Sequence, residues 1–158
     1  MGYKQDAEEQ IEAFQITRIN GQPTDEDIDK LVNELTECAA TIPTTNGGGL
    51  HGHMGMLIED AEYRTFLTGG EPFNIPTNPG AYPLNPSNNA ITRERQDAEH
   101  KMEVKEFETY LGVANGLRKK IRESVDQEWL ESICHITMGF SHLTPKQMID
   151  HLRLGGAV

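Results

Sequence analysis

The sequence has few of the residues that build disulfides, membrane spans or secretion signals. Its two cysteines, Cys38 and Cys134, are far apart and form no CxxC pattern. Both fall on predicted apolar helix faces, where a free cysteine behaves as a small hydrophobic residue. No apolar run approaches the roughly 18 residues of a membrane span, and the first residues are too polar for a signal peptide. We therefore expect a cytoplasmic protein with no disulfide, no membrane contact and no cofactor.

Basic residues are also scarce. The 158 residues include 25 acidic and 14 basic side chains, a formal net charge of −11. Residues 1–60 hold 12 of the acidic side chains and three of the basic ones, so the negative charge is concentrated in the N-terminal third. Such a surface repels nucleic-acid phosphates. RNA binding would depend on one local basic cluster, Arg118, Lys119, Lys120 and Arg122, whose alternative role is to stabilise a helix C-terminus.

No established catalytic motif occurs in the chain. The GxxxxGK[ST], GxGxxG, HExxH and GxSxG patterns are absent. Cys134 and His135 are adjacent, but adjacent side chains on a helix point about 100° apart, so they would not meet as nucleophile and base. We read Cys134 as a core residue. The sequence predicts a protein that is not an enzyme.

Apolar residues at helical spacing predict a mainly α fold. We expect helices over 6–17, over 25–40 with a capping box from Thr24 to Asp27, and over 61–67 with Asp60 as the cap. A long helix over 91–124 follows, and Gly112 and Gly116 in it predict a close helix crossing or a kink rather than dimerisation. Two more helices are expected, one containing Trp129, Leu130, Ile133 and Ile136, and one starting at Thr144-Pro145.

A glycine- and histidine-rich stretch interrupts the helices. Five glycines and two histidines lie within residues 47–55, and the pattern allows a short strand over 53–58. On a strand His51 and His53 would point the same way and could share a metal ion. A third ligand would come from His100, His135, His142, His151 or Glu59. In the alternative, the histidines bond to backbone groups and pin the turn.

Five prolines within residues 69–90 exclude a helix or a central strand there. Large apolar residues alternate with them, so we expect an ordered arm that lies in a groove, with Phe73 and Tyr82 as interaction residues. The chain then divides into an acidic helical segment (1–43), a Gly/His-rich and Pro-rich segment (44–90) and a helical core (91–158) that forms one domain with 25–90.

Several blocks of the sequence resemble the N-terminal part of Gag-like proteins of copia-type LTR retrotransposons. The first is the stretch GGGLHGHMGMLI over 47–58, with Tyr63 downstream, and the second is PFNIP over 72–76 followed by NPG over 78–80. The second half of the chain is similar to the same family around Phe107–Tyr110, Leu117–Ile121, Trp129-Leu130 and Thr144–Leu152. The resemblance covers residues 42–155.

The resemblance implies a helical capsid-like domain that associates with copies of itself, with no catalytic residues. It implies a structural role for the motif residues Gly49, His51, Gly52, His53, Gly55 and Tyr63. The family's zinc knuckle is absent and its further capsid helices do not follow, so we expect a truncated or domesticated copy, or a designed fragment, with weak support for RNA binding. Two alternatives remain: a helical adaptor that docks one partner through the Pro-rich arm or the basic cluster, and a small metal-dependent enzyme built on the two histidines.

Overall fold

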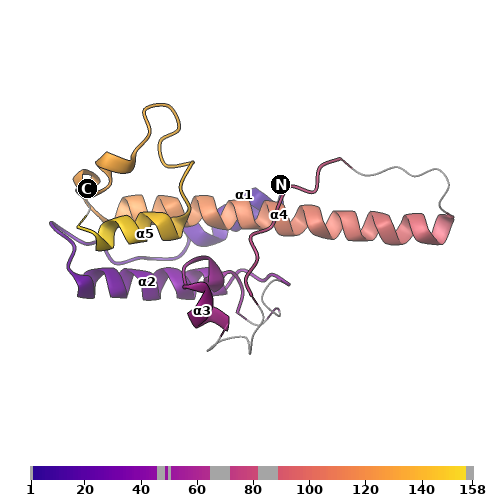
Figure 1. Ribbon diagram of the computed structural model, residues 1–158, viewed down its shortest axis with the longest axis horizontal. Helices are drawn as coiled ribbons and strands as arrows, with labels where there is room; N and C mark the ends of the chain where they lie inside the picture. The colour runs from indigo at the N-terminus through magenta and orange to yellow at the C-terminus, as the bar shows by residue number, and fades with distance from the viewer. Residues whose placement is uncertain (1, 46–48, 50, 65–71, 82–88, 156–158) are drawn as a thin grey trace.

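The computed structural model describes residues 2–45, 49, 51–64, 72–81 and 89–155. These residues form a mainly α structure without a named strand (Figure 1). Its α-helices are α1 (Tyr3–Glu12), α2 (Asp25–Ala40), α3 (Asp60–Glu62), α4 (Ala90–Ser124) and α5 (Pro145–Arg153). The predicted fold class is therefore confirmed.

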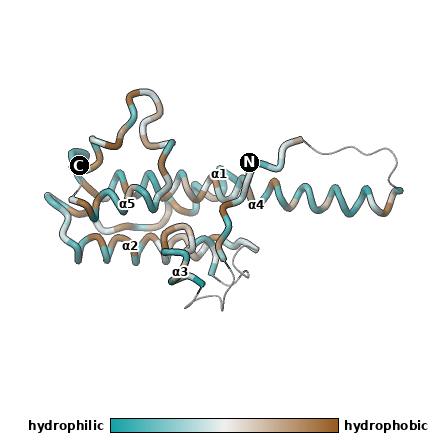
Figure 2. Tube along the Cα trace, in the orientation of Figure 1, coloured by the Kyte–Doolittle hydropathy of each residue, from teal (hydrophilic) through white to brown (hydrophobic). Residues whose placement is uncertain are grey.

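The long helix α4 is the axis of the molecule. Its 35 residues begin at an N-cap, Asn89, whose side chain accepts a hydrogen bond from the amide of Thr92. The second half of α4 lies alongside α1 and α5, whereas the first half extends beyond the other helices (Figure 1). Figure 2 shows the first half as mostly hydrophilic. The core accordingly sits around the second half of α4, where Val113, Leu117 and Ile121 are fully buried.

Helix α1 crosses α4 at two glycines. A Cβ atom on Gly112 would lie 2.2 Å from the carbonyl oxygen of Lys4, and one on Gly116 would lie 2.7 Å from the Cβ of Ile11. Only glycine lets the two backbones approach this closely. The predicted close crossing is confirmed, and its partner is the N-terminal helix.

Helices α2 and α5 both begin with the capping box that the sequence predicts. In α2, Thr24 and Asp27 exchange side-chain-to-backbone hydrogen bonds, and in α5 Thr144 and Gln147 do the same. Each pair satisfies two amides that the first turn of a helix leaves without partners. Both helices place their apolar faces in the core, through Ile28, Leu31, Leu35, Cys38 and Ala39 of α2 and Met148, Ile149 and Leu152 of α5.

The first helix begins and ends earlier than the predicted 6–17. It ends at Glu12, and the chain then runs without regular secondary structure to the start of α2. Tertiary hydrogen bonds hold this segment: Thr17 donates its amide and hydroxyl to the Glu34 carboxylate, and Ile19 donates its amide to the carbonyl of Ser124 at 2.7 Å. These partners replace the bonds that a longer helix would have made.

Two predictions for the local structure were wrong. The expected strand over 53–58 is instead a short 3-10 helix, η2 (Met54–Met56), within a series of turns. The expected helix around Trp129 is two single 3-10 turns, η4 (Gln127–Trp129) and η5 (Glu131–Ile133), followed by a loop. In this loop Cys134 is exposed, not part of the core, and Ile136 is fully exposed.

The helix predicted over 61–67 is described only at its start. It begins at Asp60, and Asp60 is not the cap: Glu59 occupies the N-cap position and its side chain makes no capping bond. The predicted end, at 67–69, lies outside the described residues, as do Tyr82 and Leu84 of the arm. Among the described helices, none combines the length and the apolar character that a bilayer span requires.

Replacing Gly112 with alanine tests the α1–α4 crossing. Alanine is favoured over glycine in an exposed helix by about 1 kcal/mol. Here its Cβ would collide with the backbone of α1, and overpacking costs about 1–3 kcal/mol. We expect Gly112→Ala to lower the free energy of unfolding, measured as a lower urea midpoint.

The matched control is Glu103→Ala, at an exposed position of the same helix, which should change stability by no more than about 0.5 kcal/mol. A Gly112→Ala protein as stable as the native one would contradict the close crossing.

Candidate functional site

The glycine- and histidine-rich stretch folds back onto the C-terminal end of α2. The amide of His53 donates to the carbonyl of Ala39 at 3.0 Å, and its ring Nδ1 lies 2.7 Å from the carbonyl oxygen of Ile42. Gly52 has a positive φ of +54°, and a Cβ there would lie 2.3 Å from the carbonyl oxygen of Ala40. The positive φ and the close approach to the Ala40 carbonyl each require glycine at position 52. The stretch therefore covers the C-terminal end of α2. This agrees with the alternative in which a histidine bonds to backbone groups and holds the turn.

His53 is almost fully buried, at 1% exposure. Because Nδ1 faces a carbonyl oxygen, it carries the proton and donates it, and Nε2 is a buried nitrogen without a hydrogen-bond partner. Burial lowers the pKa of His53 below its ordinary value of 6.5, against the smaller opposing effects of the Ile42 bond and the Glu106 charge. The imidazole is therefore held in its neutral form.

An aromatic cluster joins this turn to the Pro-rich segment. The Phe73 ring makes edge-to-face contacts with the rings of His53, at 6.2 Å between centroids, and Tyr63, at 6.0 Å. A Cβ on Gly55 would lie 2.6 Å from the Phe73 side chain. Tyr63 is buried at 1% exposure, its hydroxyl has no hydrogen-bond partner, and burial raises its pKa. Phe73 thus anchors the described part of the arm, 72–81, and three of the predicted motif residues, His53, Gly55 and Tyr63, contact it.

Metal binding finds no support in this arrangement. His51 and His53 lie in a turn, so the strand geometry that would have aligned their rings is missing. His53 packs against Phe73, and within the described ranges no three His, Cys, Asp or Glu side chains gather where an ion could be held. Gly49 has a positive φ of +77°, a structural role of the kind expected for the motif.

The basic cluster at the end of α4 is engaged within the molecule. Arg118 is half buried and donates to the carbonyl of Leu143 at 3.0 Å and to Asn115. Lys119 pairs with Glu12, and Lys120 donates to the carbonyl of the same residue at 2.8 Å. The pairing raises the pKa of Lys119 and lowers that of Glu12, while burial lowers the pKa of Arg118.

Arg122 lies over the ring of Phe140, 5.2 Å from its centroid. All four cations of the cluster therefore have partners within the chain. This arrangement favours the structural reading of the cluster, because an RNA phosphate would have to compete with contacts that already exist.

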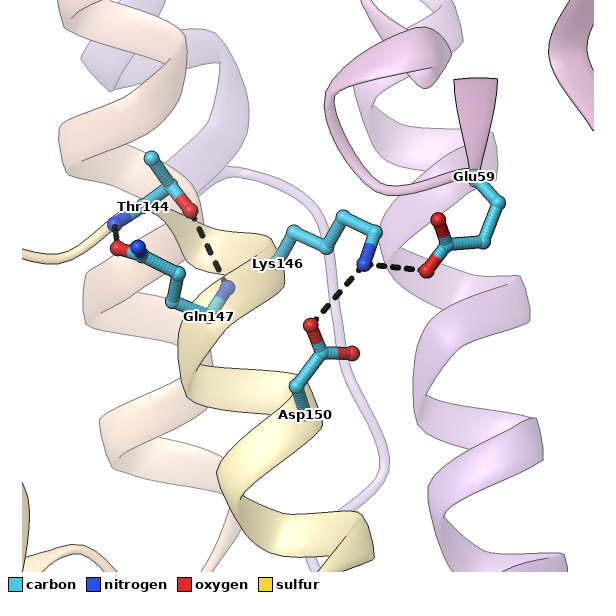
Figure 3. Close-up of polar contacts among 5 residues, drawn as sticks. All are labelled: Glu59, Thr144, Lys146, Gln147 and Asp150. Carbon is cyan, nitrogen blue, oxygen red and sulfur yellow. Dashed lines mark hydrogen bonds and ion pairs between the residues drawn. The ribbon is translucent and has the colours of Figure 1, made fainter. Parts of the chain in front are cut away.

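A groove runs between α2, α5 and the segment around Glu59. Its volume is about 480 Å³, and an apolar floor of Val32, Leu57, Ile58 and Ile149 is edged by Asp29, Asn33, Glu59, Glu62, Lys146, Asp150 and Arg153. Lys146 reaches across it from α5 to Glu59 at 2.6 Å and to Asp150 at 3.0 Å (Figure 3). Both carboxylates raise the pKa of Lys146, with the Glu59 bond the larger cause. The sequence reading missed this groove, because its residues come from three separate segments.

The loop after η5 forms a tight hairpin. His135 and Gly139 exchange backbone hydrogen bonds of 2.8 and 2.9 Å, and the ring Nδ1 of His135 accepts the amides of Thr137 and Met138. Gly139 has a φ of +60°, which closes the turn. The tip presents Ile136, 100% exposed, and Met138, 48% exposed, and it projects away from the helices (Figure 1). This ordered apolar projection was also missed, because helical spacing assigned Ile136 to a buried face.

The buried His53 predicts a specific pH dependence. Its pKa is lowered in the folded state, so its contribution to stability is complete above the unfolded value of 6.5 and is lost as the pH falls below it. We expect the difference in urea midpoint between the native protein and His53→Gln to shrink from pH 7.5 to pH 5. An NMR titration in which His53 titrates at the ordinary histidine value would contradict this expectation.

Gly55→Ala tests the contact with Phe73. The added Cβ would overlap the Phe73 side chain, so the ring must leave its place between His53 and Tyr63. We expect faster proteolytic cleavage within 72–81, detected by mass spectrometry of the fragments. Gly2→Ala, where a Cβ meets nothing within 4 Å, is the control and should leave cleavage unchanged.

Comparison with known proteins identifies no relative. The chain matches no family model, no curated protein and no solved structure. The resemblance to Gag-like proteins therefore stays a prediction based on the sequence blocks.

Proposed function

We propose that the chain is a non-enzymatic structural protein of the Gag-like capsid type, which acts by associating with copies of itself. The observation that carries the proposal is the hairpin tip. Ile136 is fully exposed on a turn that is held by backbone bonds and by the His135 ring. Single exposed apolar residues are common on protein surfaces, but an ordered tip loses little entropy when it binds.

Further support comes from where the other exposed apolar side chains lie. Ile91 and Met102 are 79% and 49% exposed on the first half of α4, which extends beyond the rest of the molecule (Figure 1). The two projections are the parts of the described chain best placed to reach a neighbouring copy. RNA binding is not part of the proposal, since the basic cluster is engaged internally.

The adaptor alternative is favoured by one observation. A second groove, of about 260 Å³, lies beside the arm and is lined by Gly55, Phe73, Ile75 and Pro145 among others. Ile75 is 58% exposed at its edge. A partner could extend this apolar surface, and a protein that stays monomeric while it binds one partner there would favour the adaptor.

Light scattering from low micromolar to several hundred micromolar protein tests self-association. The chain mass is 17.7 kDa, so growth to multiples of this mass supports the proposal and a constant 17.7 kDa overturns it. We expect Ile136→Asp to lower the average mass at a given concentration, because a charge at the tip opposes burial in an interface. Its urea midpoint should not change, since the native side chain is fully exposed.

The matched control is Leu154→Asp, at another exposed apolar position that lies outside the hairpin. It should leave the mass unchanged. Equal effects of the two variants would show that any added charge disperses the protein, and would remove the hairpin tip from the proposal.

A further inference from the structure

The turn that carries Ile136 is closed by a titratable side chain. The ring Nδ1 of His135 accepts the backbone amides of Thr137 at 3.0 Å and of Met138 at 3.1 Å. At the base of the hairpin, His135 and Gly139 exchange one pair of backbone bonds, which form an isolated bridge. A short hairpin of this kind is marginally stable by itself in water. The order of the tip therefore depends largely on the two bonds to the ring.

These two bonds require a neutral ring. Nδ1 accepts an amide only while it carries no proton, so the proton of His135 is on Nε2 in the closed turn. A protonated imidazole carries a hydrogen on both nitrogens and has no acceptor left. No rotation of the ring would restore the bonds, and its N–H would face two backbone N–H groups. Protonation and the closed turn therefore oppose each other, and histidine is the side chain that ordinarily changes charge between pH 5 and pH 8.

The groups next to the ring do not offset a positive charge. The ring of His142, which precedes α5, contacts the ring of His135 edge-to-face with 5.7 Å between centroids, so two protonated rings would repel each other. The Cys134 thiol points to the carbonyl oxygen of His135 and not to its ring. Within the described ranges, no carboxylate forms an ion pair with the His135 ring.

Helix α4 reaches the hairpin through Phe140 and supplies no excess of negative charge either. Lys119, Arg122 and Glu123 of α4 line a pocket of about 280 Å³ together with Phe140. Arg122 lies over the Phe140 ring, and Glu123 is the one carboxylate among these lining residues. The surroundings of the hairpin thus contain nothing that would keep a protonated ring in the closed turn.

We propose that the hairpin is a pH-sensitive switch: protonation of His135 releases the amides of Thr137 and Met138, opens the turn and removes the ordered Ile136 tip. This inference rests on the self-association proposed above and adds its regulation. The ordered tip binds at small entropic cost, so opening the turn weakens association. The direction is distinctive, because the pI is about 4.9 and a fall in pH towards it removes net charge, which by itself favours association.

Nuclear magnetic resonance of the dilute protein tests the switch without any association. At pH 7.5 we expect the ring of His135 to carry its proton on Nε2 and the backbone order parameters of 136–138 to be about 0.85. At pH 5.5 the ring should be protonated and these order parameters should fall below about 0.6. Those of Val113 and Leu117 should stay high, because both residues are buried in the core. A protonated ring in an unchanged turn would overturn the switch, and so would a ring that is still neutral at pH 5.5.

His135→Asn separates the acceptor from its titration. The asparagine oxygen accepts backbone amides that follow it in an Asx-turn, and it takes up no proton in this pH range. We expect this variant to keep an ordered tip at both pH values. His135→Ala, without an acceptor, should have a mobile tip at both. The matched control is His142→Asn, which removes the neighbouring histidine and should still lose tip order at pH 5.5.

Light scattering at the two pH values tests the effect on association. One unit below the ordinary value of about 6.5, a free imidazole is about nine-tenths protonated. The concentration that the native protein needs for association should therefore rise roughly tenfold from pH 7.5 to pH 5.5, and that of His135→Asn should not rise. Equal association of the native protein at both pH values, with the turn open at pH 5.5, would overturn this regulation. A native protein that is monomeric at pH 7.5, with a turn that opens in acid, would overturn the self-association and leave the switch in place.

Discussion

The close approach of α1 to the second half of α4 is the contact on which the rest of the structure depends. It requires Gly112 and Gly116, where any side chain would overlap the backbone or Cβ atoms of α1. It also sets the electrostatics of that end of the molecule. Glu12, at the end of α1, neutralises Lys119 and accepts a bond from Lys120, and Glu8 accepts a bond from Asn115 beside Arg118. Lys119 and Lys120, which the sequence predicts as possible interaction residues, therefore help to hold the N-terminal helix against α4.

The Gly/His-rich stretch loses much conformational entropy on folding, yet it contributes to tertiary packing. Glycines lose more conformational freedom on folding than other residues, and this stretch adds two buried polar groups without partners, His53 Nε2 and the Tyr63 hydroxyl. In return it covers the end of α2 and supplies the flat surface at Gly55 on which Phe73 rests. One aromatic ring thus fastens a segment that otherwise has neither helix nor strand.

Charge and apolar surface are separated across the molecule in a way that bears on association. Helix α2 and the groove beside it are acidic, whereas the exposed first half of α4 carries both cations and carboxylates. A protein with a net charge of −11 repels its own copies unless opposite charges meet at the contact. The hairpin tip at Ile136 and Met138 offers an apolar contact that adds no charge of its own. The tip belongs to a projection, so binding there leaves the core undisturbed.

The sequence by itself determined the helices with strong local signals. The capping boxes at Thr24 and Thr144 and the apolar spacing of α2 and α4 fix where these helices begin and which face is buried, because the information lies within a few residues of each position. The same local reasoning failed after Val125. There the His135 ring and the positive φ of Gly139 satisfy the backbone in a hairpin, so the apolar Ile136 faces solvent.

Only the tertiary structure decided the surfaces of the molecule, among them the hairpin tip on which the functional proposals rest. The groove joins side chains from α2, α5 and the segment around Glu59, which are separated by up to about 120 residues and share no pattern that spacing could reveal. Glu59 illustrates the physical reason. Locally it occupies a cap position, but Lys146 of α5 draws its carboxylate across the groove, because a charged partner binds it more strongly than a backbone amide would.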